Sequence, residues 1–202
     1  MFNPRFLVVS LGNPAPYHET IHSAGHVALI AAQHKLRATQ PDFTALRFGK
    51  KSTQTSLGPK YTFIQSPTEM NITGPWLSKA YRDVLVNENL SPSEMGLILV
   101  HDDLESDFGK VKVRKWDQSH KGHNGIKSVA ASLRSPSNPG CAPWSRISIG
   151  VGRPTKRDAA TVSEFVLRPL SKYQKELIAD NATPDIMTCL SELEEEWRER
   201  IG

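Results

Sequence analysis

Hydrophobic positions along the chain form short runs separated by turn-forming residues. Five runs of four or five residues are rich in Val, Ile, Leu and Phe, and a sixth run, which begins at Lys51, is weaker. Runs of this length bounded by Gly, Pro, Ser and Asn predict β-strands. The expected strands are Phe6–Ser10, Lys51–Thr55, Tyr61–Gln65, Leu97–Val100, Val111–Arg114 and Ile147–Val151.

Helical spacing fills the intervals between these strands. In the clearest case, apolar residues recur at i, i+3, i+4 and i+7 from Ile126 to Leu133, which is the period of a half-buried helix. Thr20 is a candidate cap for the first helix. The expected helices are Ala24–Lys35, Trp76–Val86, Gly125–Leu133, Ser171–Ile178 and Asp185–Arg200, and Ser135–Pro143 is expected to be a loop.

Alternation of strands and helices predicts a single three-layer α/β/α domain, with helices flanking a twisted, largely parallel but mixed β-sheet. No repeat or linker divides the 202 residues. We therefore expect one domain over 1–202, ending in an acidic helix at about 179–202. The apolar runs are too short to span a membrane, and Phe6 leaves no room for a signal peptide before the first strand. A cytoplasmic monomer is expected, with a mitochondrial location also open.

The charge is unevenly distributed. The chain has 25 Lys and Arg against 21 Asp and Glu, for a net charge of +4, although Glu192–Glu199 is strongly acidic. The densest basic run is Lys110–Lys115. In a strand, its cations share one face and its valines the other. A solvated edge strand and a surface for a phosphate backbone both fit this pattern. The two faces are Lys110, Lys112 and Arg114 against Val111 and Val113.

Polar residues follow the carboxyl ends of the expected strands, where open α/β sheets bind ligands. Asn13, Tyr17 and His22 come after the first strand, Met70 and Asn71 come after Tyr61–Gln65, and His101-Asp102-Asp103 and His123-Asn124 follow later strands. We therefore expect asparagines, histidines and an aspartate to meet at one edge of the sheet.

This set of side chains suits hydrolysis of an acyl compound. A histidine acts as a general base near neutral pH, and an aspartate beside it fixes its tautomer. Asparagine amides bind a peptide unit or polarise an acyl oxygen. No Gly-x-Ser-x-Gly motif supplies a nucleophile, and neither Cys141 nor Cys189 shows a local sign of activation. The simplest mechanism is therefore attack by water that a histidine activates.

Other interpretations of the same residues stay open. His22 and His26 have the i, i+4 spacing of zinc ligands, but Ser23 stands where the zinc-protease motif has glutamate. His101-Asp102-Asp103 is a second candidate metal site. Asn124 is a candidate cap of the following helix. The basic run alone would suit an RNA-binding module without catalysis.

Together, the motifs resemble the bacterial-type peptidyl-tRNA hydrolase family over about Phe6 to Ile178. Leu7–Pro14 is similar to that family's opening strand and Gly-Asn-Pro turn. The other matching segments, in order, are Tyr17–His22, Thr68–Gly74, Val100–Leu104, Gly122–Gly125, Arg146–Pro154 and Phe165–Leu167.

The resemblance implies an enzyme that uses no metal or organic cofactor to hydrolyse the ester between a peptide and the 3′ end of tRNA. It implies that His22 is the general base and that Asp102 orients it. Asn13, Tyr17, Met70, Asn71 and Asn124 would bind the peptidyl end, and Lys112 and Arg114, assisted by Arg146, would hold tRNA phosphates. A tRNA-binding module without catalysis and a metal-dependent phosphoesterase are the alternatives.

This sequence departs from the family pattern near the expected site. Ile21 and Ser23 flank His22 where arginine and asparagine are usual, and Ala15 stands where glycine is usual. Lys115–Ser119 replaces a glycine-rich stretch, and Arg114 replaces a lysine. These departures concern the entrance and the contact with tRNA, whereas His22 and Asp102 are present.

Overall fold

The computed structural model of the protein describes residues 5–133 and 144–201. The expected loop Ser135–Pro143 and Cys141 lie outside the described residues. The strands are β1 (Arg5–Ser10), β2 (Thr44–Phe48), β3 (Lys51–Leu57), β4 (Tyr61–Gln65), β5 (Met95–Asp103), β6 (Val111–Lys115) and β7 (Ser145–Gly150). The α-helices are α1 (Ala24–Lys35), α2 (Thr73–Glu88), α3 (Asn124–Leu133), α4 (Ala159–Val166), α5 (Lys172–Leu177) and α6 (Thr183–Ile201).

Short helical turns connect several of these elements. The 3₁₀ turns are η1 (Ile21–Ser23), η2 (Met70–Ile72) and η3 (Pro92–Glu94), and a π-helical segment, η4 (Ile178–Ala182), joins α5 to α6. The expected cap at Thr20 is wrong. Its side chain caps no helix, because the Thr20 hydroxyl donates instead to the carbonyl oxygen of Tyr17 at 2.9 Å.

Within the described residues the strands form one seven-stranded sheet in the order β2-β3-β4-β1-β5-β7-β6. Four consecutive strands, β4, β1, β5 and β7, run parallel. The other three strands, β2, β3 and β6, pair antiparallel with their neighbours. The expected mixed, largely parallel sheet is therefore confirmed, and the basic strand β6 lies at one outer edge.

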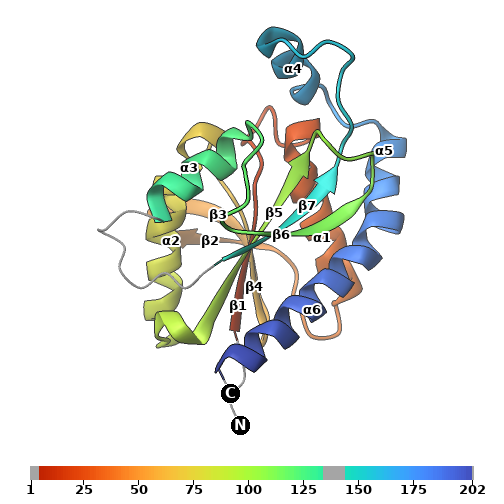
Figure 1. Cartoon of the computed structure of the whole chain (residues 1–202). Coiled ribbons are helices and arrows are strands. Elements are labelled where there is room, and N and C mark those ends of the chain that lie inside the picture. The colour runs from red at the N-terminus through yellow and green to blue at the C-terminus, as the bar shows by residue number, and fades with distance from the viewer. Residues whose placement is uncertain (1–4, 134–143, 202) are drawn as a thin grey trace.

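Helices cover both faces of the sheet, which gives the three expected layers. Figure 1 shows α2 and α3 on one face and α1 and α6 on the other. Strand alternation separates the side chains of β1 accordingly: Phe6 and Val8 pack with α1 and α6, whereas Leu7 and Val9 pack with α2 and α3. Two apolar cores thus hold the sheet between them.

The carboxyl ends of the parallel strands meet at the end of the sheet that faces α4 (Figure 1). β1 ends at Ser10, β4 at Gln65 and β5 at Asp103. β5 is longer than the sequence predicts because its polar end continues to pair with β7, with Asp102 opposite Ile149.

Among the described residues, none of the helices combines the length and the apolar character that a membrane span needs.

Candidate active site

A pocket of about 870 Å³ opens at these carboxyl ends. Its size is typical of a site for a small ligand or the end of a larger one. The turn after β1, the segment after β4, the end of β5 and the loop before α3 all line it. Among the residues singled out in the sequence, those that line it are Asn13, Tyr17, His22, Met70, Asn71, His101, Asp102, Asp103, Arg114, His123, Asn124 and Arg146.

His22 and Asp102 form a hydrogen-bonded pair at the base of this pocket. His22 comes from η1, just before α1, and Asp102 from the buried end of β5. The distance from His22 Nδ1 to Asp102 Oδ1 is 2.9 Å. Because a carboxylate only accepts hydrogen bonds, Nδ1 carries the proton. Nε2 is then the basic nitrogen of a ring that lines the pocket.

A second histidine donates to the same carboxylate oxygen. His123 Nε2 lies 3.0 Å from Asp102 Oδ1, and its Nδ1 accepts the backbone N–H of Ile126 at 3.3 Å. A nitrogen that accepts a hydrogen bond carries no proton, so this backbone contact fixes His123 as the neutral Nε2–H tautomer. His123 therefore supplies Asp102 with a donor and keeps no free base of its own.

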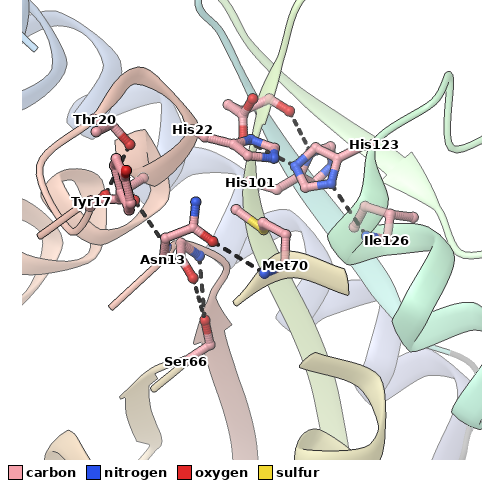
Figure 2. A network of polar contacts seen from close by, with 12 residues as sticks. Asn13, Tyr17, Thr20, His22, Ser66, Met70, His101, His123 and Ile126 are labelled. Carbon is pink, nitrogen blue, oxygen red and sulfur yellow. Dashed lines mark hydrogen bonds and ion pairs between the residues drawn. The ribbon is translucent and has the colours of Figure 1, made fainter. Parts of the chain in front are cut away.

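A third histidine lies beneath this pair. His101 is 5% exposed, and its Nδ1 is 2.7 Å from the carbonyl oxygen of Asp102. Its ring meets that of His123 edge to face, with 4.9 Å between the centroids. Burial lowers the pKa of His101 to about 3, so it stays neutral. Figure 2 shows the three imidazoles grouped on one side of the site, with Asn13 and Met70 facing them.

The electrostatics favour an ionised Asp102 and a basic His22. Burial by itself would raise the pKa of Asp102, but the neighbouring His22 and His123 outweigh it and hold this pKa well below its usual 3.8. Burial would likewise lower the pKa of His22, yet the charge of Asp102 and the hydrogen bond raise it above 6.5. His22 is thus a stronger base than free histidine.

Asn13 presents an amide donor to the pocket. Its Oδ1 accepts the backbone N–H of Met70 at 3.1 Å, which leaves the amino group for a ligand, and Figure 2 shows that group pointing towards the side of His22. Gly125 helps to place Met70, because a Cβ at Gly125 would lie 2.8 Å from the sulfur of Met70. The amide of Asn13 is therefore oriented before any ligand binds.

The other predicted substrate contacts surround the same opening. Tyr17 is 46% exposed at its rim. Asn71 is exposed within η2, and Asn124 is the first residue of α3. The structure thus brings together all five residues of the predicted peptidyl-binding set.

The three predicted phosphate ligands differ in their surroundings. Lys112 is exposed on β6 but does not line the pocket. Arg114 lines it and pairs with Asp103, with 3.1 Å between Nη2 and Oδ2. Arg146 is 2% exposed, and its Nη2 donates to the carbonyl oxygens of Lys115 and Gln118. In this structure Arg146 supports the loop after β6, and its contact with phosphate stays a prediction.

The chain is similar to known proteins along nearly its whole length. The sequence model of a family described as peptidyl-tRNA hydrolase matches residues 7–200, which is nearly the whole chain. The chain belongs to the peptidyl-tRNA hydrolase family. A peptidyl-tRNA hydrolase from Corynebacterium diphtheriae is 34% identical over 84% of this chain and 86% of the relative. One from Rickettsia africae is 32% identical over 97% and 99% of the two chains.

Solved structures of peptidyl-tRNA hydrolases share the fold. The crystal structure of the Acinetobacter baumannii enzyme at 1.00 Å resolution aligns with a TM-score of 0.66 and 21% identity, covering 100% of this chain and 95% of that one. A point mutant of that enzyme aligns with a TM-score of 0.68 and 20% identity, covering 98% of this chain and 93% of that one. The three-layer architecture is therefore that of known peptidyl-tRNA hydrolases.

Several pocket residues of this member of the peptidyl-tRNA hydrolase family have no role predicted from the sequence. His123 lies beside Asn124 in the segment Gly122–Gly125, but its contact with Asp102 depends on the path of the loop before α3. Arg153 and Arg157 also line the pocket. The signal for them was their place directly after β7, at the carboxyl edge of the sheet.

The candidate metal sites fare differently. Among the described residues, His22, Asp102 and His123 are the group close enough to hold an ion; neither His26 nor Asp103 belongs to it. However, His22 Nδ1 and His123 Nε2 both donate a proton to Asp102 Oδ1, and a ring nitrogen must lose its proton before it can bind a metal. If the proton of His123 moved from Nε2 to Nδ1, the ring would also lose its hydrogen bond with the backbone N–H of Ile126. The observed hydrogen bonds therefore suit an imidazole base with orienting groups better than a metal site.

Proposed function

We propose that this protein hydrolyses the ester bond that joins an N-substituted aminoacyl group or peptide to the 3′ end of tRNA. The observation that carries the proposal is the contact between His22 Nδ1 and Asp102. It leaves His22 Nε2 as the basic nitrogen and raises the pKa of the ring. The same pocket also presents the amide of Asn13. The products are free tRNA and a free peptide.

In the proposed mechanism, His22 Nε2 removes a proton from water as the water oxygen attacks the ester carbon. The negative charge of Asp102 stabilises the imidazolium, and the amino group of Asn13 stabilises the oxyanion of the tetrahedral intermediate. When the intermediate collapses, the bond to the ribose 3′ oxygen breaks and the imidazolium returns its proton to that oxygen. No metal or organic cofactor takes part.

His123 supports this cycle without exchanging protons. Its Nε2–H holds Asp102 Oδ1 in place while His22 gains and loses charge, and the backbone of α3 holds His123 in turn. A second donor also keeps the carboxylate ionised. In this proposal Asp102 never takes up the proton.

Selectivity for a blocked amino group follows from three asparagine amides that line the pocket. Asn13, Asn71 and Asn124 offer amides that suit a peptide unit, and Tyr17 and Met70 add apolar contact. A free aminoacyl ester would place an ammonium beside these uncharged amides, at the cost of part of its hydration. We therefore propose that peptidyl-tRNA is preferred over aminoacyl-tRNA.

The opposite side of the pocket is cationic and suits the tRNA. Arg114 and the predicted ligands Lys112 and Arg146 belong to β6 and β7, and Arg153 and Arg157 extend this side towards α4. Cations that contact phosphates hold a backbone without reading its sequence. The proposed partner is therefore the acceptor stem of many tRNAs. We propose a monomer as the active form, working where ribosomes make peptidyl-tRNA, in the cytoplasm or in mitochondria.

The two alternative functions make different predictions in one assay. N-acetyl-aminoacyl-tRNA is incubated with the protein, with and without EDTA, and the freed acid is measured. We expect release that EDTA leaves unchanged, and much slower release from tRNA whose aminoacyl group is free. Binding without release would indicate a non-catalytic tRNA-binding module. Release that EDTA abolishes would indicate metal chemistry and contradict the proposed mechanism.

The pH dependence of kcat/KM tests the raised pKa of His22. A general base works when neutral, so activity should rise with pH through a pKa above 6.5, the ordinary value. Asp102→Asn removes the charge that raises this pKa, so the rising limb of the pH profile of kcat/KM should move to lower pH. A limb that stays in place in this variant would show that another group controls the reaction. The measurement is kcat/KM at constant ionic strength from pH 5 to 9.

A further inference from the structure

Ser23 lies directly after His22, and its side chain is fully buried. Its hydroxyl makes two hydrogen bonds: it accepts the backbone N–H of Asn13 at 3.0 Å, and it donates to the carbonyl oxygen of Tyr17 at 2.7 Å. Because a hydroxyl has one proton, the bond to Tyr17 fixes its direction and leaves a lone pair for Asn13. One oxygen therefore connects the segments that carry three site residues.

The other contacts of Asn13 lead elsewhere. Its Oδ1 binds the backbone of Met70 in η2. The hydroxyl of Ser66, which follows β4, bonds both the N–H and the carbonyl oxygen of Gly12. These contacts fix the turn after β1 relative to the β4 side of the pocket. The hydroxyl of Ser23 connects this turn to η1, where His22 lies.

We infer that Ser23 is a positioning residue, which sets the position of the Asn13 amide relative to the imidazole of His22; this role rests on the proposed function. The residue itself does not touch the substrate. Its position is one where the family resemblance leads us to expect asparagine. Here a short hydroxyl does the linking, because it reaches both backbone groups from the end of η1.

Removing the hydroxyl should affect the reaction more than the fold. In Ser23→Ala the N–H of Asn13 and the carbonyl of Tyr17 lose their partner in a buried place, and unpaired backbone groups shift to find another. A misplacement of about 1 Å in a site can cost about 10²-fold in rate. We therefore expect kcat to fall by about 10- to 100-fold, with a smaller change in KM. The pKa of the rising limb should not move, because the contact between His22 and Asp102 remains.

Ser56→Ala is the matched control. Ser56 is also fully buried, accepts one hydrogen bond, from Gln40 at 2.9 Å, and donates one to the carbonyl of Pro41. It lies on β3 and does not line the pocket. We expect it to lower the melting temperature about as much as Ser23→Ala does, while kcat stays at the wild-type value.

Amide hydrogen exchange gives a readout that does not depend on catalysis. The N–H of Asn13 should be protected in the wild type and in Ser56→Ala, and should exchange at least about tenfold faster in Ser23→Ala because it loses its acceptor. A kcat within twofold of wild type, an equally protected Asn13, or an equal loss of kcat in Ser56→Ala would overturn the inference. A wild-type protein without ester hydrolysis would contradict the proposed function instead.

Discussion

Replacing His22 with alanine should lower kcat for N-acetyl-aminoacyl-tRNA by about 10²- to 10⁴-fold, the range expected when a general base is removed. The reason is geometric: Asp102 binds Nδ1 and so leaves Nε2 as the base facing the pocket. The tRNA should still bind, because the cations of β6 are untouched. Binding and single-turnover hydrolysis, measured on the same preparation, separate the two effects.

His34→Ala is the control for this experiment. His34 lies near the end of α1, is exposed and does not line the pocket. Its loss should leave kcat at the wild-type value. If His22→Ala bound tRNA normally and kept its turnover, the base would have to be another group and the proposed mechanism would fail.

Asp102→Asn should produce the second largest loss, about 10²-fold or more in kcat. An amide in place of the carboxylate removes the charge that stabilises the imidazolium of His22. Both ring nitrogens donate to the same oxygen, Oδ1, and the amide oxygen of Asn can take its place and accept both hydrogen bonds. The contacts of His22 and His123 therefore persist while the charge is lost. Steady-state kinetics and the pH profile of the variant would show the effect of that lost charge.

A carboxylate outside the pocket provides the comparison. Asp83 on α2 is half-buried and accepts the backbone N–H of Gly49 at 2.7 Å. Asp83→Asn changes the same chemical group and weakens one hydrogen bond, so it should alter stability slightly and leave kcat unchanged. Equal losses in the two variants would mean that the effect of Asp102→Asn comes from the fold.

Much of the fold follows from the sequence because its inner strands are buried on both faces and read as continuous apolar runs. The elements that sequence analysis missed are exposed. β2 buries one side chain, Phe48, and half-buries another, Leu46, so it shows no apolar run. α4 is short and stands away from the sheet in Figure 1. In the structure Asp158 caps its start, where the carboxylate accepts the N–H of Thr161 at 2.9 Å.

The ends of elements were harder to predict than their cores. α2 begins at Thr73, three residues before the predicted Trp76, although Pro75 suggests a break. Proline fits there because the first turn of a helix has no partner for its N–H groups. In β6 the predicted alternation is confirmed: Val111 and Val113 pack on the core beside α1 and α6, while Lys112 is exposed.

The residues of the candidate site could be predicted from the sequence, but their hydrogen-bond partners could not. The rule that parallel strands end at one edge brought Asn13, Met70 and Asp102 together from sequence alone. The partners of these groups depend on side-chain rotation and loop path, which spacing does not encode. That is why the donor role of His123 and the link through Ser23 appeared only in the structure.

The two apolar cores have a consequence for how activity is lost. His22 is mounted on the α1 side of the sheet, His123 on the α3 side, and Asp102 on the strand between them. Catalytic geometry therefore exists only while both helical layers are docked. Partial unfolding of either layer should therefore abolish turnover. During denaturation, an enzyme assay would detect the first layer to detach before circular dichroism showed a large loss of average helix content.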